Sequence, residues 1–463
     1  MAELADIGVV GLGVMGANLA LNLAEHGFRV AVYDRDFSKA DALSQGEYGA
    51  RFVTCSTEDT LLAAIAPPRP VLMLVPAGGP TDDAIQSLSK LASPGDVLVD
   101  AGNSDFHDTR RRTAKLEAQG LSFLGIGVSG GAEGARTGPA MMAGGSRAIW
   151  GRVAPMLQAI AARYGDVPCA DWLGPDGAGH FVKTVHNGIE YADMQMIAEV
   201  YGLMRDGLAQ DASFIGATFS EWAVGPLASY LVEIAAEVAE SVDPDTGRAI
   251  LDVIADKAGQ KGTGRWSVIE AQRLGTVAST IEAAVGARNL SAATYLRKML
   301  VETSRGKPGI DVSVSDLHDA LLAGKVIAYA QGFDLLARAS QEFDWQLDLA
   351  SVARVWRAGC IIRSGMLDDI ANAFDASPNV PLMAVPDFRQ HLADVMPALR
   401  RVVSAAVLSG LPVPALSSAL SFRDQLALPR GTANMLQGLR DRFGQHGFER
   451  TDREGGGFHG PWI

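Results

Sequence analysis

The feature that most constrains this 463-residue chain is a glycine-rich loop near its N-terminus. An apolar run, Ile7-Gly8-Val9-Val10, is followed at once by Gly11-Leu12-Gly13-Val14-Met15-Gly16 and then by a helical pattern over 16–26 that Gly27 ends. Glycines at these spacings allow a tight turn, the approach of a pyrophosphate to the backbone and close packing of a helix on a strand. The pattern predicts a strand, a dinucleotide-binding loop over residues 11–16 and a helix.

Further apolar runs over 28–33, 71–75, 97–99 and 121–126 alternate with helical patterns, which is typical of a parallel sheet built from βαβ units. After Gly174-Pro175-Asp176-Gly177 the chain is rich in Ala, Leu, Ile and Met at helical spacing. We therefore expect an α/β, Rossmann-type, doubly wound N-terminal domain over 1–178. A large all-α domain over 179–435 and a short, glycine-rich C-terminal tail over 436–463 would follow it.

The composition excludes several classes of protein. A net charge of −13 disfavours binding to nucleic acid, although a local cluster of Lys and Arg can still hold a small anion. We find no run of about 18 apolar residues and no secretory leader, so we expect no membrane span. Three widely spaced cysteines argue against a disulfide framework or a zinc site and favour a reducing compartment. These features predict a cytoplasmic protein without a metal.

Residues 34–36 lie where the second strand is expected to end, the position that meets the adenosine ribose in this type of fold. Asp34 can accept hydrogen bonds from the 2′- and 3′-hydroxyls, which favours NAD. Arg35 can pair with a 2′-phosphate, which favours NADP, or can be a solvated turn residue. Asp36 adds a negative charge that disfavours a 2′-phosphate. The sequence leaves both coenzymes open.

The segment over 179–191 carries an unusual set of polar side chains. Lys183, His186, Asn187, Glu190 and Tyr191 recur at helical spacing and fall in one arc. The opposite arc is apolar and consists of Val182, Val185, Ile189, Ala192 and Met196. The alternative is an ordinary amphipathic helix with a solvated Lys–Glu face, but His, Asn and Tyr are atypical of such a face. The pattern favours a functional face.

An amine and a carboxyl on one helix face can divide acid–base chemistry between them. Lys183 must be neutral to act as a base, and Glu190 must be protonated to act as an acid. Burial would lower the pKa of the amine and raise the pKa of the carboxyl. Gly188 lies inside the same helix at a cost of about 1 kcal/mol, which predicts that another group approaches closely there.

The chain resembles the 6-phosphogluconate dehydrogenase family, in its long, dimeric form, over nearly its whole length. The motifs that carry the resemblance are the glycine loop, Asp100-Ala101-Gly102-Asn103-Ser104, Gly127-Val128-Ser129-Gly130-Gly131, Glu133-Gly134-Ala135-Arg136, the Lys183 helix, Gly259-Gln260-Lys261-Gly262-Thr263-Gly264, Tyr329-Ala330-Gln331-Gly332-Phe333, Gly359-Cys360-Ile361-Ile362-Arg363-Ser364 and Arg440-Asp441-Arg442-Phe443-Gly444-Gln445-His446.

The resemblance implies oxidative decarboxylation of 6-phosphogluconate to ribulose 5-phosphate and CO2, in the pentose phosphate pathway, without a metal. Lys183 would be the general base and Glu190 the acid. The substrate would be held by Asn103, Ser129, Gly130, Gly131, His186, Asn187, Tyr191, Lys261, Thr263, Arg288, Arg440 and His446. NADP, with NAD as the alternative, would be held by Gly11, Leu12, Gly13, Val14, Met15, Gly16, Asp34, Arg35, Asp36, Val75, Pro76, Ala77 and Asn103.

The resemblance also implies a homodimer in which the C-terminal tail completes the partner subunit's site with Arg440 and His446. The chain departs from the family's usual residues at Asp34 and Asp36, where neutral residues are common, and this leaves NADP preference open. Two alternatives remain. One is another dehydrogenase of the 3-hydroxyacid superfamily, which would not need the phosphate-binding residues. The other is a dinucleotide-binding regulatory protein without catalytic activity, which the presence of both Lys183 and Glu190 disfavours.

Overall fold

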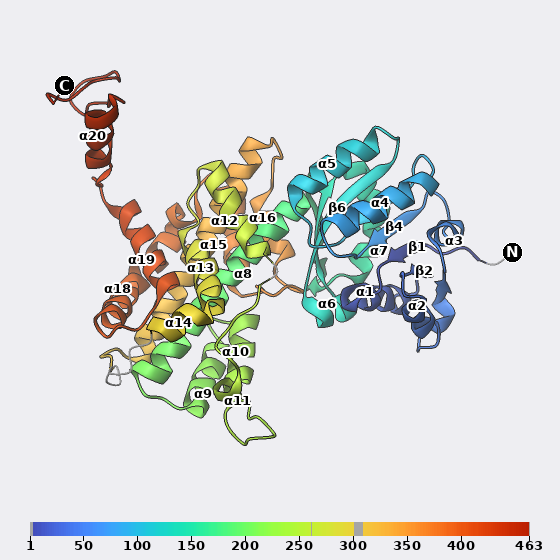
Figure 1. Cartoon of the computed structure of the whole chain (residues 1–463), viewed down its shortest axis with the longest axis horizontal. Coiled ribbons are helices and arrows are strands. Elements are labelled where there is room, and N and C mark those ends of the chain that lie inside the picture. The colour runs from blue at the N-terminus through green and yellow to red at the C-terminus, as the bar shows by residue number, and fades with distance from the viewer. Residues whose placement is uncertain (1–2, 261, 301–308, 463) are drawn as a thin grey trace.

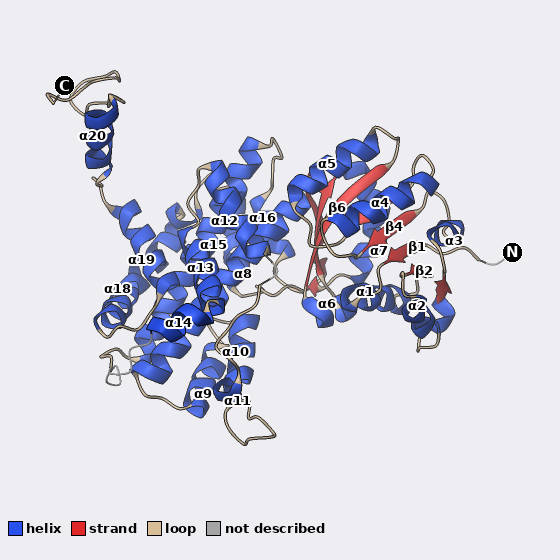
Figure 2. Ribbon diagram, in the orientation of Figure 1, coloured by secondary structure: helices blue, strands red, loops and turns tan. Residues whose placement is uncertain are grey.

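The computed structural model describes residues 3–260, 262–300 and 309–462. Strands gather in the N-terminal half and helices form the rest, as Figures 1 and 2 show. The main sheet has eight strands: β1 (Ile7–Val10), β2 (Val30–Tyr33), β3 (Phe52–Thr54), β4 (Pro70–Met73), β5 (Val97–Asp100), β6 (Ser122–Ser129), β7 (Ala140–Gly145) and β10 (Ala170–Gly174). This confirms the predicted Rossmann-type fold followed by a helical region.

The strand order is β10-β7-β6-β5-β4-β1-β2-β3, and the pairs are parallel except for β6 with β7. The chain direction across the sheet reverses between β1 and β4, which is the switch point where such folds bind ligands beyond the carboxyl ends of the strands. The glycine loop follows β1 at this point. The topology therefore places the candidate coenzyme loop at the edge where ligands are expected.

Helices cover both faces of this sheet in the blue and cyan part of Figure 1. They are α1 (Val14–Glu25), α2 (Phe37–Ser44), α3 (Glu58–Ala63), α4 (Gly79–Leu91), α5 (Phe106–Glu117), α6 (Gly131–Thr137) and α7 (Arg147–Ile160). The sequence patterns identified five of the strands and missed β3, β7 and β10. A separate two-stranded ribbon joins β8 (Arg163–Tyr164) to β9 (Val167–Pro168).

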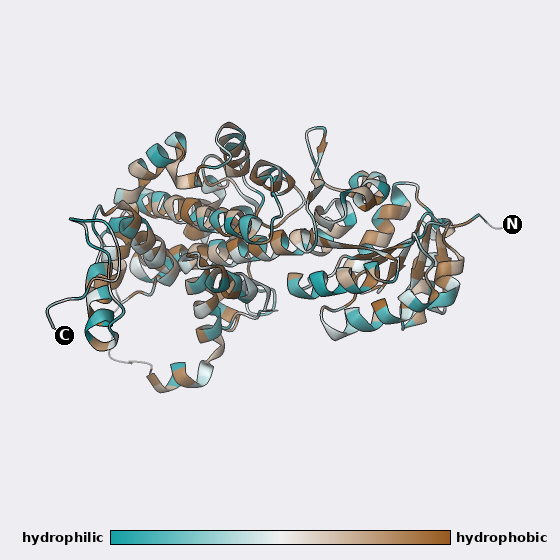
Figure 3. Cartoon of the chain, turned by 90° about the horizontal axis from the view of Figure 1, so that it is seen from above, coloured by the Kyte–Doolittle hydropathy of each residue, from teal (hydrophilic) through white to brown (hydrophobic). Residues whose placement is uncertain are grey.

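The helical half is built around two long helices, α8 (Ala178–Gly202) and α15 (Val314–Glu342). The others are α9 (Ala212–Trp222), α10 (Tyr230–Glu240), α11 (Ile250–Val253), α12 (Thr263–Leu274), α13 (Ser279–Ala292), α14 (Thr294–Leu300), α16 (Leu349–Val355), α17 (Met366–Ala376), α18 (Pro386–Leu408), α19 (Pro414–Ala427) and α20 (Ala433–Gly444). In Figure 3 hydrophobic residues concentrate in the sheet and the central helices.

Among the described residues, α15 alone is long and apolar enough to cross a membrane by length and composition, a candidate that the search for uninterrupted apolar runs did not find. However, 89% of its most apolar window is buried inside the protein. It packs against α8, α18 and α19. This burial identifies α15 as a core helix of the helical half.

The first turn of α8 connects the two halves of the chain. The buried ring of His180 lies 2.7 Å from the Thr109 hydroxyl and 3.1 Å from the carbonyl oxygen of Gly102. Phe181 packs in an edge-to-face arrangement against Phe106 of α5, with ring centroids 4.9 Å apart. These contacts fix α8 against the sheet, so the polar residues that follow on α8 face the carboxyl ends of the strands.

The C-terminal tail stands away from the rest of the chain. Helix α20 lies at the end of the molecule opposite the sheet in Figures 1 and 3. A short hairpin follows it, closed by backbone hydrogen bonds of 2.9 and 3.0 Å between Phe448 and Phe458. Four apolar side chains of α20 are more than half exposed: Met435, Leu436, Leu439 and Phe443.

Candidate active site

The glycine loop has the shape of a dinucleotide cradle. Gly11 adopts φ +89°, and a Cβ on Gly16 would lie 1.9 Å from the carbonyl oxygen of Gly11, so both positions require glycine. By contrast, a Cβ on Gly13 would meet nothing within 4 Å. The loop therefore leaves open space beside the N-terminus of α1, where free N–H groups and the helix dipole favour a phosphate. The residues present fit a dinucleotide.

Asp34 lies at the end of β2 and is fixed by three donors. One carboxylate oxygen accepts from the backbone N–H of Leu12 at 2.7 Å, and the other accepts from the N–H of Asp36 at 2.9 Å and from Lys39 Nζ at 3.2 Å. These bonds hold the pKa of Asp34 below its ordinary value despite partial burial, which acts in the opposite direction. Arg35 is exposed. The carboxylate therefore stays ionised at the rim of the glycine loop.

Asp36 has a local structural role. Its carboxylate accepts from the Ser38 N–H at 3.2 Å and from the Ser38 hydroxyl at 2.6 Å, and it caps α2. The sequence alone predicts for Asp36 only a charge beside the ribose. The structure adds this cap, and it adds the ion pair between Lys39 and Asp34, which the sequence analysis missed.

A buried network of hydrogen bonds and an ion pair stabilises the loop that carries Asn103. Asp100 accepts from the Gly102 N–H at 3.0 Å and from the Ser104 hydroxyl at 2.7 Å, and it pairs with Arg112 at 3.2 Å. The guanidinium of Arg112 also donates to the Gly78 carbonyl at 3.0 Å. Sequence analysis did not single out Arg112 because its role depends on groups from three separate segments.

Residues 75–77 follow β4 at the same edge of the sheet, and Pro76 and Ala77 are exposed. Val75 lies beside the glycine loop, since its Cγ1 is 3.0 Å from where a Cβ on Gly11 would be. The Asn103 amide oxygen accepts from Asn187 Nδ2 of α8 at 3.4 Å. The structure thus brings together the loops after β1, β4 and β5 and one face of α8.

Lys183 is the central group of that face. Its side chain is buried, and Nζ donates to Ser129 Oγ at 3.0 Å and lies 3.2 Å from His186 Nδ1. His186 Nε2 is 3.2 Å from the same Ser129 hydroxyl. A neutral His186 that accepts at Nδ1 carries its proton on Nε2 and donates it to Ser129. Helix α8 and the end of β6 therefore form a closed triangle of polar groups.

Burial shifts the acid–base equilibria of these groups. It lowers the pKa of Lys183, although the carboxylate of Glu190 acts in the opposite direction. It also lowers the pKa of His186 well below its ordinary value, and nearby Lys183 adds to this effect. Burial raises the pKa of Glu190, whose carboxylate is 3.7 Å from His186 Nδ1. The environment therefore favours the neutral forms of both an amine and a carboxyl.

Most of α8 is buried on every side, so it is not a half-exposed amphipathic helix. Its polar face is directed into the protein, toward β6 and α12. The close approach expected at Gly188 is confirmed, because a Cβ there would lie 2.6 Å from Ser267 Oγ of α12. That hydroxyl donates to the Thr184 carbonyl at 2.7 Å.

The N-terminus of α12 and a cationic side chain lie at the far end of this face. Thr263 is the first residue of α12 and is buried. The guanidinium of Arg288 stacks over the Tyr191 ring, 3.7 Å from its centroid. Lys261, which the resemblance assigns to the phosphate, lies outside the described residues.

The turn after β6 is shaped by Gly130 (φ +121°) and Gly131 (φ +63°), which begin α6. The backbone N–H groups at this helix start lie beside Ser129.

Cys360 is buried, its thiol lies 3.0 Å from the Trp356 carbonyl oxygen, and burial raises its pKa to about 12. Such a thiol is inert at neutral pH. In the described part of the chain, no group of three or more His, Cys, Asp or Glu side chains is arranged to hold a metal.

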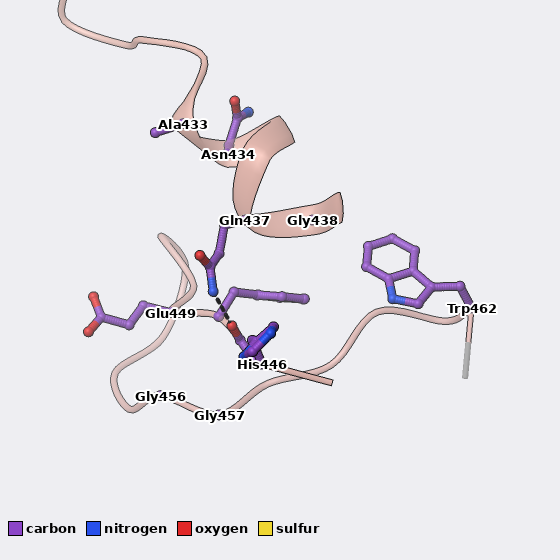
Figure 4. A pocket seen from close by; sticks show the side chains of 11 residues that line it. Ala433, Asn434, Gln437, Gly438, His446, Glu449, Gly456, Gly457 and Trp462 are labelled. Atoms are coloured by element: carbon purple, nitrogen blue, oxygen red, sulfur yellow. Dashed lines mark hydrogen bonds between the residues drawn. The ribbon is translucent and has the colours of Figure 1, made fainter. Parts of the chain in front are cut away.

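The structure does not bring Arg440 and His446 to Lys183 of the same chain, because both lie on the outlying tail (Figure 1). His446 lines a hollow between α20 and the C-terminal hairpin, together with Gln437 and Trp462 (Figure 4). This hollow is separate from the cluster around Lys183.

Comparison with known proteins gives matches along the chain. The model of the NAD-binding domain of 6-phosphogluconate dehydrogenase matches residues 6–174, and the model of the C-terminal domain of 6-phosphogluconate dehydrogenase matches 179–462. A decarboxylating 6-phosphogluconate dehydrogenase of Synechococcus elongatus is 44% identical over 99% of this chain and 100% of its own length. Two Bacillus subtilis relatives, named NAD(+)-dependent and NADP(+)-dependent, are 42% and 41% identical, each over 99% of both chains.

A solved structure of Plasmodium falciparum 6-phosphogluconate dehydrogenase has a TM-score of 0.95 and 36% identity, covering 99% of this chain and 100% of that one. That protein has been solved in its apo form, in complex with NADP+ and in complex with 6-phosphogluconate. The sequence and structure matches extend across both halves of the fold and the tail. This chain belongs to the 6-phosphogluconate dehydrogenase family.

Proposed function

We propose that this protein catalyses the oxidative decarboxylation of 6-phospho-D-gluconate to D-ribulose 5-phosphate and CO2 with a nicotinamide dinucleotide. The observation that carries the proposal is the pairing of Lys183 and Glu190 on one buried face of α8. Burial moves the pKa of each toward the neutral form that a base and an acid need. Family membership supplies the substrate class, and this face supplies the two proton-transfer groups.

In the first step, neutral Lys183 takes the proton from the C3 hydroxyl of the substrate. The glycine loop would hold the pyrophosphate of a dinucleotide, whose nicotinamide would supply the acceptor for the hydride from C3. Ser129 and His186 hold the amine in place through contacts of 3.0 and 3.2 Å, so the lone pair has a fixed direction. The C3 alcohol becomes a ketone, and Lys183 becomes an ammonium that hydrogen-bonds the new carbonyl oxygen.

In the second step, the bond between C1 and C2 breaks and C1 leaves as CO2. The electron pair moves into the C3 carbonyl, which the Lys183 ammonium stabilises as an enediol. Glu190 then gives its proton to C2, which becomes C1 of ribulose 5-phosphate. The cycle leaves Lys183 protonated and Glu190 ionised, so before the next turnover Lys183 releases the proton that it took from the substrate, and Glu190, whose side chain is 20% exposed, takes one from solvent.

The same face and its neighbours provide the substrate contacts that we propose. Asn103, Ser129, Gly130 and Gly131 hold the carboxylate end, and His186 and Asn187 hold hydroxyls. Tyr191, Thr263, Arg288 and Lys261 bind the phosphate. A phosphate beside Arg288 suits this strongly acidic chain, because the guanidinium supplies a local positive charge with several donors.

For the coenzyme we propose a preference for NAD. Asp34 remains ionised at the end of β2, where a ribose 2′-hydroxyl can donate to it and a 2′-phosphate would be repelled. Lys39 and Arg35 favour NADP instead, since both are cations near the position that a ribose 2′-phosphate would occupy. The loops over 11–16 and 75–77 and Asn103 complete the proposed coenzyme contacts.

We further propose that two copies assemble so that the tail of each completes the site of the other with Arg440 and His446. The exposed apolar side chains of α20 support this arrangement, because such a surface is stabilised when a partner covers it. A cytoplasmic location is proposed from the sparse cysteines, and Cys55, Cys169 and Cys360 are all buried and free.

The test is steady-state turnover by the purified chain with 6-phosphogluconate, gluconate or 3-hydroxyisobutyrate, each with NAD and with NADP. We expect reduced coenzyme and CO2 with 6-phosphogluconate only, and a higher kcat/KM with NAD. Preference for a substrate without phosphate would replace the proposal with a different 3-hydroxyacid dehydrogenase. Absence of turnover with either coenzyme would indicate a binding protein.

A further inference from the structure

Asp441 occupies an unusual position in the C-terminal tail. It is the only buried residue of α20, a helix whose other side chains are all at least partly exposed. An aspartate is among the residues least often fully buried, and its exposed fraction here is 0%. A tail that merely adhered to another surface would not need a buried carboxylate at its centre, so Asp441 calls for an explanation.

The carboxylate of Asp441 joins three separate parts of the tail. Oδ1 accepts from the Gly447 N–H at 2.9 Å and lies 2.7 Å from His459 Nδ1. Oδ2 accepts from the Gly460 N–H at 3.0 Å and from the indole N–H of Trp462 at 3.1 Å. Burial opposes ionisation, but these donors outweigh it and lower the pKa of Asp441 to about 2. The carboxylate is therefore fully paired.

Arg440 and His446 are the two tail residues that the proposed function assigns to the partner's site, and the bond from Asp441 to Gly447 closes the segment that carries His446. Arg440 precedes Asp441 on α20, and its guanidinium donates to Gln437 Oε1 at 3.1 Å. His446 lies in the turn between Gln445, which adopts φ +51°, and Gly447. The N–H of Gly447 bonds to Asp441, and its carbonyl accepts from Gln437 Nε2. The turn that carries His446 is thus fixed on both sides.

We infer that Asp441 is a positioning residue for catalysis in trans. Its carboxylate fixes the turn that carries His446 to α20, the helix that carries Arg440, and the partner subunit's site receives both side chains as a preformed unit for the substrate phosphate. The inference rests on the proposed function. It explains why a segment with almost no hydrophobic core of its own is folded around one carboxylate.

The first test is Asp441→Asn, which keeps the shape but places an NH2 group opposite donors of the tail. We expect the KM for 6-phosphogluconate to rise about tenfold, which is the size of effect typical of losing a hydrogen bond to a charged group. The kcat and the KM for the coenzyme should change less than threefold. The matched control is Asp452→Asn, since Asp452 is an exposed tail aspartate that pairs only with Arg450 among its described contacts. The control should keep the parent's constants.

The second test is complementation between two defective subunits. A mixed dimer of Lys183→Met and Asp441→Asn subunits has one site with an intact lysine and an intact partner tail. We expect the purified mixed dimer to regain the parent's KM in that one site, with about half the parent's kcat per dimer. A residue that only stabilises its own subunit would give no such recovery.

Each outcome decides the inference separately from the proposed function. If the parent turns over 6-phosphogluconate but Asp441→Asn keeps its KM, the inference is wrong and the function stands. If kcat, both KM values and the dimer are all lost together, Asp441 has a general structural role and the inference is also wrong. If Asp441→Asn does not fold, the test uses Trp462→Phe, which removes a single donor to the carboxylate. A rise in the KM for 6-phosphogluconate alone would support the inference, and an unchanged KM would refute it.

Discussion

Replacing Lys183 with methionine should remove the chemistry and leave the fold intact. Methionine is similar in length and unbranched, so it fills the same buried space. The change removes the contacts of 3.0 and 3.2 Å from Nζ, but Ser129 Oγ keeps its other partner, His186 Nε2, at 3.2 Å. His186 Nδ1 loses its donor, which costs about 1–3 kcal/mol for a buried acceptor, but the desolvation penalty of a buried amine is also removed. These two effects oppose each other, so we expect a Tm within a few degrees of the parent's.

The catalytic loss should be large, because a positioned general base contributes about 10²–10⁴-fold. That range corresponds to about 2.7–5.4 kcal/mol of transition-state stabilisation. The assay compares kcat from the absorbance of the reduced coenzyme, the Kd of 6-phosphogluconate from calorimetry and the Tm of parent and variant. We expect kcat to fall within that range with a similar Kd. Turnover within threefold of the parent at equal Tm would refute the assignment of Lys183 as base.

Three other outcomes are expected. The kcat should rise with pH as Lys183 loses its proton and fall again as Glu190 loses its own, and a profile that rises without a maximum would contradict the acid's role. Asp34→Asn should raise the NADP-to-NAD ratio of kcat/KM at least tenfold, while Asp36→Asn, which keeps the α2 cap, should raise it less, because the Asp36 carboxylate is engaged by the N–H and hydroxyl of Ser38. Gly188→Ala should cost about 1–3 kcal/mol in denaturant unfolding through its contact with Ser267, and an unchanged midpoint would refute that contact.

Local sequence patterns were sufficient to predict the fold class because each element carries its own signal. The glycine loop, the strand before it and the helix after it are contiguous, and apolar spacing identified five of the eight strands of the main sheet. The missed strand β7 spans Ala140–Gly145 and contains no β-branched residue. Its antiparallel pairing with β6 is a tertiary property that no short pattern encodes.

The candidate site was partly predictable for the same reason. Lys183, His186 and Glu190 lie on one helix face, so spacing alone grouped them. The supporting residues were not predictable in this way. Arg112 joins Asp100 and Gly78 from different segments, and the capping role of Asp36 depends on where α2 begins. Such roles arise only when the fold brings distant segments together.

The separation of Lys183 and Glu190 explains how burial can both lower the pKa of an amine and raise the pKa of a carboxyl on the same helix face. Lys183 Nζ is 3.2 Å and Glu190 Oε2 is 3.7 Å from the same His186 Nδ1, so the two groups lie at most about 7 Å apart. At an effective dielectric constant near 20, opposite charges attract by about 4 kcal/mol at 4 Å but by about 2.4 kcal/mol at about 7 Å. Direct contact would favour the charged forms of both groups. With the neutral His186 ring between them, burial outweighs their attraction, so the pKa of Lys183 falls while that of Glu190 rises.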